Sequence, residues 1–171
     1  MTRSPAAAGQ PVVVKVGSSS LASHEGGLDV AALRSVVDQV VELWSRGHPT
    51  VLVSSGAVAA GLLELAIDRR PTQVPDLQAA AAVGQGRLME RYASEFGARK
   101  RLVGQVLLTK DVLANRNQYL HAREALDRML ALGIVPVVNE NDTVVVDELR
   151  LGDNDRLAAI VSHLVGAALL V

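Results

Sequence analysis

The sequence predicts an α/β protein, in which a mainly parallel β-sheet is covered by helices on both faces as a three-layer αβα sandwich. Short apolar runs alternate along the chain with longer segments whose apolar residues recur at helical spacing. The short runs are continuously apolar, which is typical of parallel strands buried on both faces. With 171 residues, of which 49% are hydrophobic, the chain can bury one sizeable core, so we expect one domain over residues 11–171.

The expected strands are five of these short apolar runs. In chain order they cover residues 11–16, 50–53, 102–108, 134–138 and 167–171. Small or polar residues follow the first, second and fourth runs directly. In an open parallel sheet, such residues lie at the carboxyl ends of the strands, where ligands bind.

The expected helices fill the segments between the strands. They cover residues 29–46, 58–65, 77–96, a region from 109–111 to a stop at Gly133, and 156–164. Asp29 is a candidate N-cap, and Gly47 is a candidate stop signal. Gly84 and Gly86 lie inside an expected helix, where each costs about 1 kcal/mol relative to alanine. We therefore expect close packing there, against another element or another subunit.

Two polar clusters stand out between apolar runs near the end of the chain. Residues 139–142 (Asn-Glu-Asn-Asp) follow the strand 134–138, and residues 152–155 (Gly-Asp-Asn-Asp) precede the last helix. Residues 144–151 alternate between apolar and charged residues as a short hairpin would, which would fold the second cluster back towards the first. Either cluster alone is typical of a turn or a helix cap, with Asp153 or Asn154 as the capping residue.

Together, the two clusters offer a ligand both carboxylates and amides. These side chains are Asp142, Asp153, Asp155, Asn139, Asn141 and Asn154. Carboxylates can hold an ammonium group, while amides and backbone N–H groups can hold a carboxylate. The inventory therefore suits a zwitterionic ligand.

Two further turns lie at expected strand ends. Gly17 and Ser18 follow the first strand, where backbone N–H groups could approach a phosphate and Lys15 could add a positive charge. The spacing of a Walker loop is missing. Ser55 and Gly56 follow the second strand, where we expect a ligand-binding turn rather than a nucleophilic serine, because the G-x-S-x-G pattern is absent.

Composition argues against several classes of protein. A net charge of −1 and 2% aromatic residues do not favour nucleic-acid binding. The sequence has no cysteine for disulfides or thiolate chemistry, and its four histidines are too scattered for a metal site. Residues 1–10 look like a disordered tail without the apolar core of a signal peptide, and no apolar run reaches membrane-spanning length. We expect a soluble, cytoplasmic protein.

Taken together and in this order, the motifs at 15–18, 54–57, 139–142 and 152–155 resemble those of the glutamate 5-kinase family, a branch of the amino acid kinase family. The resemblance runs from Val12 onward. It implies an enzyme that uses ATP and Mg²⁺ to phosphorylate the side-chain carboxylate of L-glutamate, the first step of proline biosynthesis. It also implies a homo-oligomer and the feedback inhibition by proline that the family often shows.

The resemblance also implies roles for individual residues. Lys15 matches the catalytic lysine that contacts the ATP phosphates, with Gly17 and Ser18 in the phosphate-facing turn. Asp155 matches the aspartate that orients the catalytic lysines. The expected glutamate-binding residues are Ser55, Gly56, Asn139, Asp142 and Asn154. The nucleophile is the ionised carboxylate of glutamate itself, so no general base is required.

The resemblance is incomplete in one respect. Members of the family continue into adenine-binding loops and a second catalytic lysine, which residues 1–171 do not contain. We therefore expect this chain to be the amino-terminal, glutamate-binding part of such a kinase, truncated before the nucleotide-binding half and inactive alone. A non-catalytic amino-acid-binding or oligomerisation module is the alternative from another class, and an acetylglutamate kinase or aspartokinase-type enzyme is the alternative within the fold.

Overall fold

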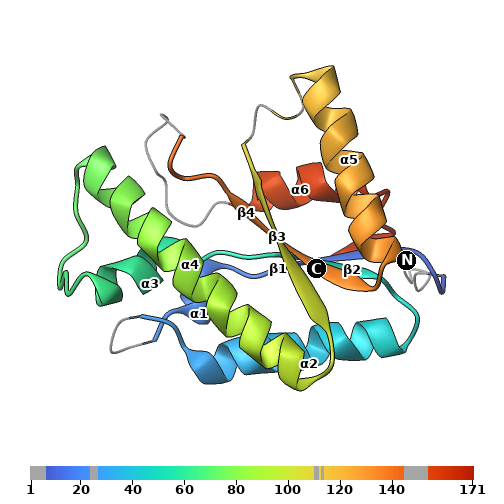
Figure 1. The fold of residues 1–171 in the computed structure, drawn as a ribbon, viewed down its shortest axis with the longest axis horizontal. Coiled ribbons are helices and arrows are strands. Elements are labelled where there is room, and N and C mark those ends of the chain that lie inside the picture. The colour runs from blue at the N-terminus through green and yellow to red at the C-terminus, as the bar shows by residue number, and fades with distance from the viewer. Residues whose placement is uncertain (1–6, 24–26, 110–111, 113, 145–153) are drawn as a thin grey trace, which may run out of the picture.

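The computed structural model describes residues 7–23, 27–109, 112, 114–144 and 154–171, and these residues form a five-stranded sheet (Figure 1). The strand order is β3-β4-β2-β1-β5, and every neighbouring pair is parallel. The strands are β1 Val12–Lys15, β2 Thr50–Val53, β3 Leu102–Leu108, β4 Ile134–Glu140 and β5 Leu169–Leu170. The predicted parallel sheet is thus confirmed.

Helices cover both faces of this sheet. They are α1 Ser18–Leu21, α2 Val30–Ser45, α3 Ala57–Glu64, α4 Val74–Ala98, α5 Arg116–Ala131 and α6 Asp155–Leu164. Helices α2 and α4 pack on one face, and α5 and α6 pack on the other (Figure 1). This arrangement confirms the predicted three-layer αβα sandwich.

Successive residues of each strand serve opposite faces of the sheet. In β1, Val13 belongs to the core beneath α5 and α6, while Val14 packs against the core beneath α2 and α4. In β4, Val138 and Val137 divide in the same way. Both faces are buried, which is why the strands read as continuous apolar runs.

Helix ends follow local capping chemistry where the sequence predicted it. Asp29 precedes α2, and its carboxylate accepts a hydrogen bond of 2.9 Å from the backbone N–H of Ala32. Gly47 and Gly133 follow α2 and α5 with φ values of 85° and 73°, the left-handed region that favours glycine. These three predictions are confirmed.

One predicted helix start was wrong, and another falls mostly outside the described residues. The helical region predicted from 109–111 includes residues 110, 111 and 113, which the structure does not describe. Helix α5 itself begins at Arg116, where the side chain of Asn115 caps it by accepting hydrogen bonds from the N–H groups of Asn117 and Gln118. Helix α4 begins at Val74, before the predicted 77, and includes Pro75 in its first turn. A proline is tolerated there because the first N–H groups of a helix have no intrahelical partner.

Some predictions fall on residues that the structure does not describe or treats only in part. The predicted hairpin 144–151 lies almost wholly outside the described residues, as do Gly152 and Asp153. Residues 1–6 of the predicted tail also lie outside them, while the backbone N–H of Gly9 donates to the carbonyl of Gly47 at 2.8 Å. No helix in the described part of the chain is both long and apolar enough to cross a membrane.

Strand β5 lies at the edge of the described sheet and pairs with β1 alone. Leu170 is 41% exposed and Val171 is 68% exposed. The strand predicted at 167–171 is present here as β5, Leu169–Leu170.

Helices α3 and α4 pack with their backbones in contact. A Cβ atom added at Gly84 would lie 1.8 Å from the carbonyl oxygen of Ala57, and one added at Gly61 would lie 1.7 Å from that of Ala80. The predicted close packing at Gly84 is therefore confirmed, and its partner is another helix of the same chain. At Gly86 an added Cβ would meet nothing within 4 Å, so this glycine is not packed against another described element of the chain, and packing against another subunit stays a prediction.

The two glycines of α4 should respond to alanine in opposite directions. We expect Gly84→Ala to destabilise the protein by about 1–3 kcal/mol or more, because the new methyl group would push α3 and α4 apart. Gly86→Ala should stabilise it by about 0.5–1 kcal/mol, because alanine favours the helix and has free space. Denaturant unfolding of both variants measures the two changes, and equal effects would contradict the backbone contact.

Candidate functional site

The polar turns predicted from the sequence meet at one edge of the sheet. Strand β2 lies between β1 and β4, and Val53, near its end, pairs with both Lys15 and Val138. The three neighbouring strands therefore end side by side. The segments that follow them lie at the carboxyl edge, where open α/β sheets bind ligands.

The side-chain amide of Asn154 joins the start of α6 to two of the converging segments, the one after β2 and the end of β4. Its Nδ2 donates hydrogen bonds to the carbonyl oxygen of Ser54 at 2.6 Å, to Ser55 Oγ at 3.0 Å and to Asn139 Oδ1 at 3.0 Å. Asn154 is 7% exposed. It occupies the N-cap position of α6 but makes no side-chain capping bond. The sequence left open whether Asn154 is a helix cap or a ligand-binding residue, and in the structure its side chain bonds Ser54, Ser55 and Asn139 instead of capping α6.

Asn139 connects this cluster to helix α4. Its Nδ2 donates to Gln85 Oε1 at 2.8 Å, and its Oδ1 accepts from the backbone N–H of Glu140 at 2.9 Å as well as from Asn154. The sequence did not single out Gln85. The available signal was its spacing from Ala81 and Leu88, which places a polar side chain among the buried residues of α4.

A second support from α4 reaches the end of β2. The hydroxyl groups of Tyr92 and Ser54 lie 2.8 Å apart, and both residues are fully buried. Burial raises the pKa of Tyr92 to about 12, although the hydrogen bond with Ser54 acts in the opposite direction. The tyrosine hydroxyl therefore stays protonated near neutral pH and serves as a hydrogen-bonding group. Tyr92, like Gln85, was not predicted.

Lys15 and Asp155 form an ion pair beside the group of Ser55, Asn139 and Asn154, which we call the amide cluster. Lys15 Nζ, at the end of β1, lies 2.7 Å from Asp155 Oδ1, in the first turn of α6. A Cβ added at Gly17 would lie 3.6 Å from the same Nζ, so the ammonium group lies over the turn that follows β1. The carboxylate also lies at a helix N-terminus, where the dipole favours negative charge. The two predicted catalytic residues are thus in contact.

The predicted phosphate-facing turn has a different local structure from the one expected. Gly17 is the N-cap of the short helix α1, which begins at Ser18, so these residues form a helix start rather than an irregular turn. Both are half-buried. The φ of Gly17 is −74°, so its conformation does not require glycine.

The predicted turn after β2 is present. Ser55 is 4% exposed, and Gly56 caps α3 with a φ of 102°, in the left-handed region that favours glycine. After β4, the half-buried Asp142 lies in the turn that follows Asn141. The backbone N–H of Asn141 donates to the carbonyl of Leu108 at 2.8 Å, which ties this turn to the end of β3.

The described residues contain no group of three or more His, Cys, Asp or Glu side chains that could hold a metal ion. The Lys15 ammonium group supplies a cation beside the amide cluster, in its pair with Asp155, which follows Asn154 in the sequence. A lysine above a turn of small residues is suited to an anionic group such as a phosphate.

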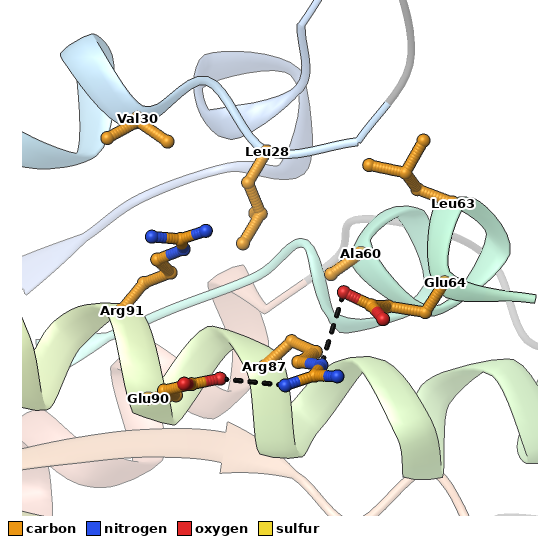
Figure 2. Close-up of a pocket in the computed structure, with 8 residues that line it drawn as sticks. All are labelled: Leu28, Val30, Ala60, Leu63, Glu64, Arg87, Glu90 and Arg91. Atoms are coloured by element: carbon orange, nitrogen blue, oxygen red, sulfur yellow. Dashed lines mark hydrogen bonds and ion pairs between the residues drawn. The ribbon is translucent and has the colours of Figure 1, made fainter.

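A separate hollow of about 320 Å³ opens between the start of α2 and helices α3 and α4 (Figure 2). Its lining residues are Leu28, Val30, Ala60, Leu63, Glu64, Arg87, Glu90 and Arg91, none of which is a predicted site residue. Arg87 pairs with Glu64 at 3.1 Å and with Glu90 at 3.0 Å, so its charge is already compensated by the protein (Figure 2). Such exposed pairs contribute little to the stability of a fold. We therefore place the candidate site at the amide cluster.

Comparison with known proteins shows which family the chain resembles over almost its whole length. The sequence pattern described as the amino acid kinase family matches residues 10–171. The chain is 51% identical over 170 residues to a glutamate 5-kinase of Thermobifida fusca, covering 99% of this chain and 44% of that protein. It is 54% identical over 160 residues to a glutamate 5-kinase of Geobacter sp. strain M21 and 55% identical over 160 residues to one of Frankia casuarinae.

In these last two cases the match covers 94% of this chain and 43% of the relative. The chain therefore spans less than half the length of the curated relatives that it matches. The family pattern covers the sheet, the helices on both faces and every predicted site residue, from Lys15 to Asp155. The chain belongs to the amino acid kinase family.

Proposed function

We propose that this chain is the amino-acid-binding part of a glutamate 5-kinase. The whole enzyme would transfer a phosphoryl group from ATP to the side-chain carboxylate of L-glutamate and form γ-glutamyl phosphate, the first step of proline biosynthesis. One observation carries the proposal: the buried amide of Asn154 gathers Ser55 and Asn139 beside the ion pair of Lys15 and Asp155. Relatives named glutamate 5-kinase favour this activity over that of other amino acid kinases.

The amide cluster is suited to a zwitterionic substrate because its hydrogen bonds within the protein leave one donor and one acceptor for a ligand. Ser55 Oγ accepts a hydrogen bond from Asn154, which leaves the serine O–H to donate to a substrate carboxylate. Asn154 Nδ2 is used by three protein acceptors, which leaves Asn154 Oδ1 to accept from a substrate ammonium group. The carboxylate of Asp142 would hold the same ammonium group, and the N–H of Gly56 would donate to a carboxylate.

The Lys15 side of the site would serve the phosphoryl donor. Lys15 would contact the ATP phosphates together with the turn at Gly17 and Ser18, and Asp155 would hold the lysine ammonium group in place. Mg²⁺ would arrive with ATP and neutralise charge on its phosphate oxygens. The substrate carboxylate is ionised at neutral pH and needs no general base. Positioning and charge neutralisation would therefore supply the catalysis.

The remaining features follow from the same assignment. We propose a cytoplasmic enzyme that forms a homo-oligomer and is inhibited by proline, without a nucleic-acid or membrane partner. A non-catalytic amino-acid-binding or oligomerisation module would keep the pocket at Asn154 but would not transfer phosphate. Glutamate-dependent ADP release by the full-length protein separates these two functions.

Removing the central amide should weaken glutamate binding selectively. We expect Asn154→Ala, and likewise Asp142→Ala, to raise the KM for glutamate in the full-length enzyme by about 10- to 100-fold, since hydrogen bonds to charged groups contribute about 1.5–3 kcal/mol. The KM for ATP should rise far less, although loss of the Asn154 bonds also loosens the placement of Asp155 against Lys15. Ser162→Ala is the matched control, because Ser162 also lies on α6 but bonds only the carbonyl of Ala158 among the described residues. Equal losses for glutamate and ATP would indicate misfolding.

Lys15→Ala should act on turnover. A cation placed where charge develops contributes most in the transition state, and loss of one such group costs on the order of 10²–10³ in kcat. Steady-state kinetics of the full-length enzyme with both substrates measures this loss. Lys100→Ala, at an exposed lysine beyond α4, is the control. If kcat does not change, Lys15 has a structural role only and does not take part in catalysis.

Residues 1–171 expressed alone should show no glutamate-dependent ADP release. Phosphoryl transfer requires both reactants to be held in line, and this segment supplies only the amino-acid side and one phosphate lysine. It should also self-associate, because β5 offers a free strand edge with Leu170 and Val171 exposed. A coupled ADP assay and sedimentation velocity test both points. Robust turnover, or a stable monomer, would contradict the respective claim.

A further inference from the structure

We infer that Gln85, on helix α4, is a positioning residue that sets the direction of the Asn139 and Asn154 amides and thereby presents Asn154 Oδ1 to the substrate ammonium group. The inference rests on the proposed function, since it names the part of glutamate that this oxygen would meet. Gln85 itself would touch no substrate. It would act through a relay of two hydrogen bonds between three side-chain amides.

The relay is directional because each amide has one accepting end and one donating end. Gln85 Oε1 accepts from Asn139 Nδ2 at 2.8 Å, which turns Asn139 Oδ1 towards α6. Asn139 Oδ1 then accepts from Asn154 Nδ2 at 3.0 Å. Asn154 is thereby held with its nitrogen on the protein and its oxygen at the opposite end. The exposed fractions of Gln85, Asn139 and Asn154 are 9%, 3% and 7%, so water competes little for these bonds.

The amide nitrogen of Gln85 lacks a partner, which indicates that glutamine at this position is not optimal for stability. Gln85 Nε2 is buried and has no hydrogen-bond partner among the described residues. A buried donor without a partner costs about 1–3 kcal/mol, which an apolar side chain of similar size would avoid. What glutamine supplies, and leucine or methionine could not, is the acceptor for Asn139. This cost points to a role in the site rather than in the core.

The neighbouring residues hold Gln85 in place. Gly84 brings the backbone of α4 against Ala57, the first residue of α3, directly after the turn of Ser55 and Gly56. Tyr92, two helix turns further along the same buried face, bonds the hydroxyl of Ser54 in the segment after β2. Helix α4 is thus fixed relative to the site at both points, and Gln85 lies between them with little freedom to move.

The direction of the relay matters for the choice of substrate. If Asn154 were turned over, its NH₂ group would face the substrate ammonium group, and two donors would oppose each other. The present direction favours an amino acid with a free ammonium group over a dicarboxylate without one. Gln85 would therefore contribute to specificity without contacting the ligand.

The test is Gln85→Met in the full-length enzyme, which keeps the volume of the side chain and removes the acceptor. We expect the KM for glutamate to rise about tenfold, with kcat and the KM for ATP nearly unchanged. The preference in kcat/KM for glutamate over glutarate, which lacks the amino group, should fall about tenfold. Gln85→Glu should restore both values towards wild type, because a buried, protonated carboxyl group still offers an acceptor to Asn139.

Leu88→Val is the control for lost stability, because Leu88 is fully buried on the same face of α4 and belongs to the apolar core. It should lower the melting temperature without changing the preference for glutamate over glutarate. The relay is overturned if Gln85→Met keeps the wild-type preference, or if Leu88→Val loses it to the same extent. A wild-type enzyme that does not phosphorylate glutamate would overturn the proposed function. A crystal structure of the Gln85→Met protein would then decide the relay, and unmoved Asn139 and Asn154 side chains would overturn it.

Discussion

The site depends on one buried amide nitrogen, Asn154 Nδ2. It bonds the segment after β2 and the end of β4, which lie 100 and 15 residues away in the sequence. A buried amide group left without hydrogen-bond partners costs about 1–3 kcal/mol of stability. The acceptors of Asn154 therefore hold the start of α6 in place. The next residue, Asp155, is thereby placed against Lys15. The carboxylate side chain of Asp155 is 73% exposed, and an exposed ion pair of this kind would be weak and loosely oriented without the buried bonds beside it.

Helix α4 supplies the support for this edge of the sheet from a distant part of the chain. Its buried face carries Gln85 and Tyr92, which bond Asn139 at the end of β4 and Ser54 after β2 respectively. The helix can stand close enough because Gly84 and Gly61 remove the Cβ atoms that would separate α4 from α3. Gly84 and Gly61 take no part in the chemistry of the site, but the close packing that they allow determines where the polar side chains of α4 lie.

The sequence was a good guide wherever a local rule decided the structure. Strands β2 and β3 have the predicted bounds, and in the fully buried β2 the reason is that an apolar run with an abrupt polar end specifies a buried parallel strand. The predicted residues Lys15, Ser55 and Asn139 lie at one edge of the sheet because parallel strands end there. Gln85 and Tyr92 could not be assigned, because a polar residue in an amphipathic helix has no partner until the helix is packed. Nor could periodicity tell that α5 begins at Arg116, where the Asn115 side chain caps it.

The supporting groups around the site do not titrate near neutral pH. Asparagine, glutamine and serine side chains stay neutral, and burial raises the pKa of Tyr92 to about 12, so its hydroxyl stays protonated. The hydrogen bonds that place Asn154 therefore keep the same donors and acceptors over the range in which a carboxylate substrate is ionised. An enzyme that needs a general base must hold one group close to its titration point. Phosphoryl transfer to a carboxylate that is already ionised has no such need, and a framework of uncharged amides and hydroxyls can position the reactants without responding to pH.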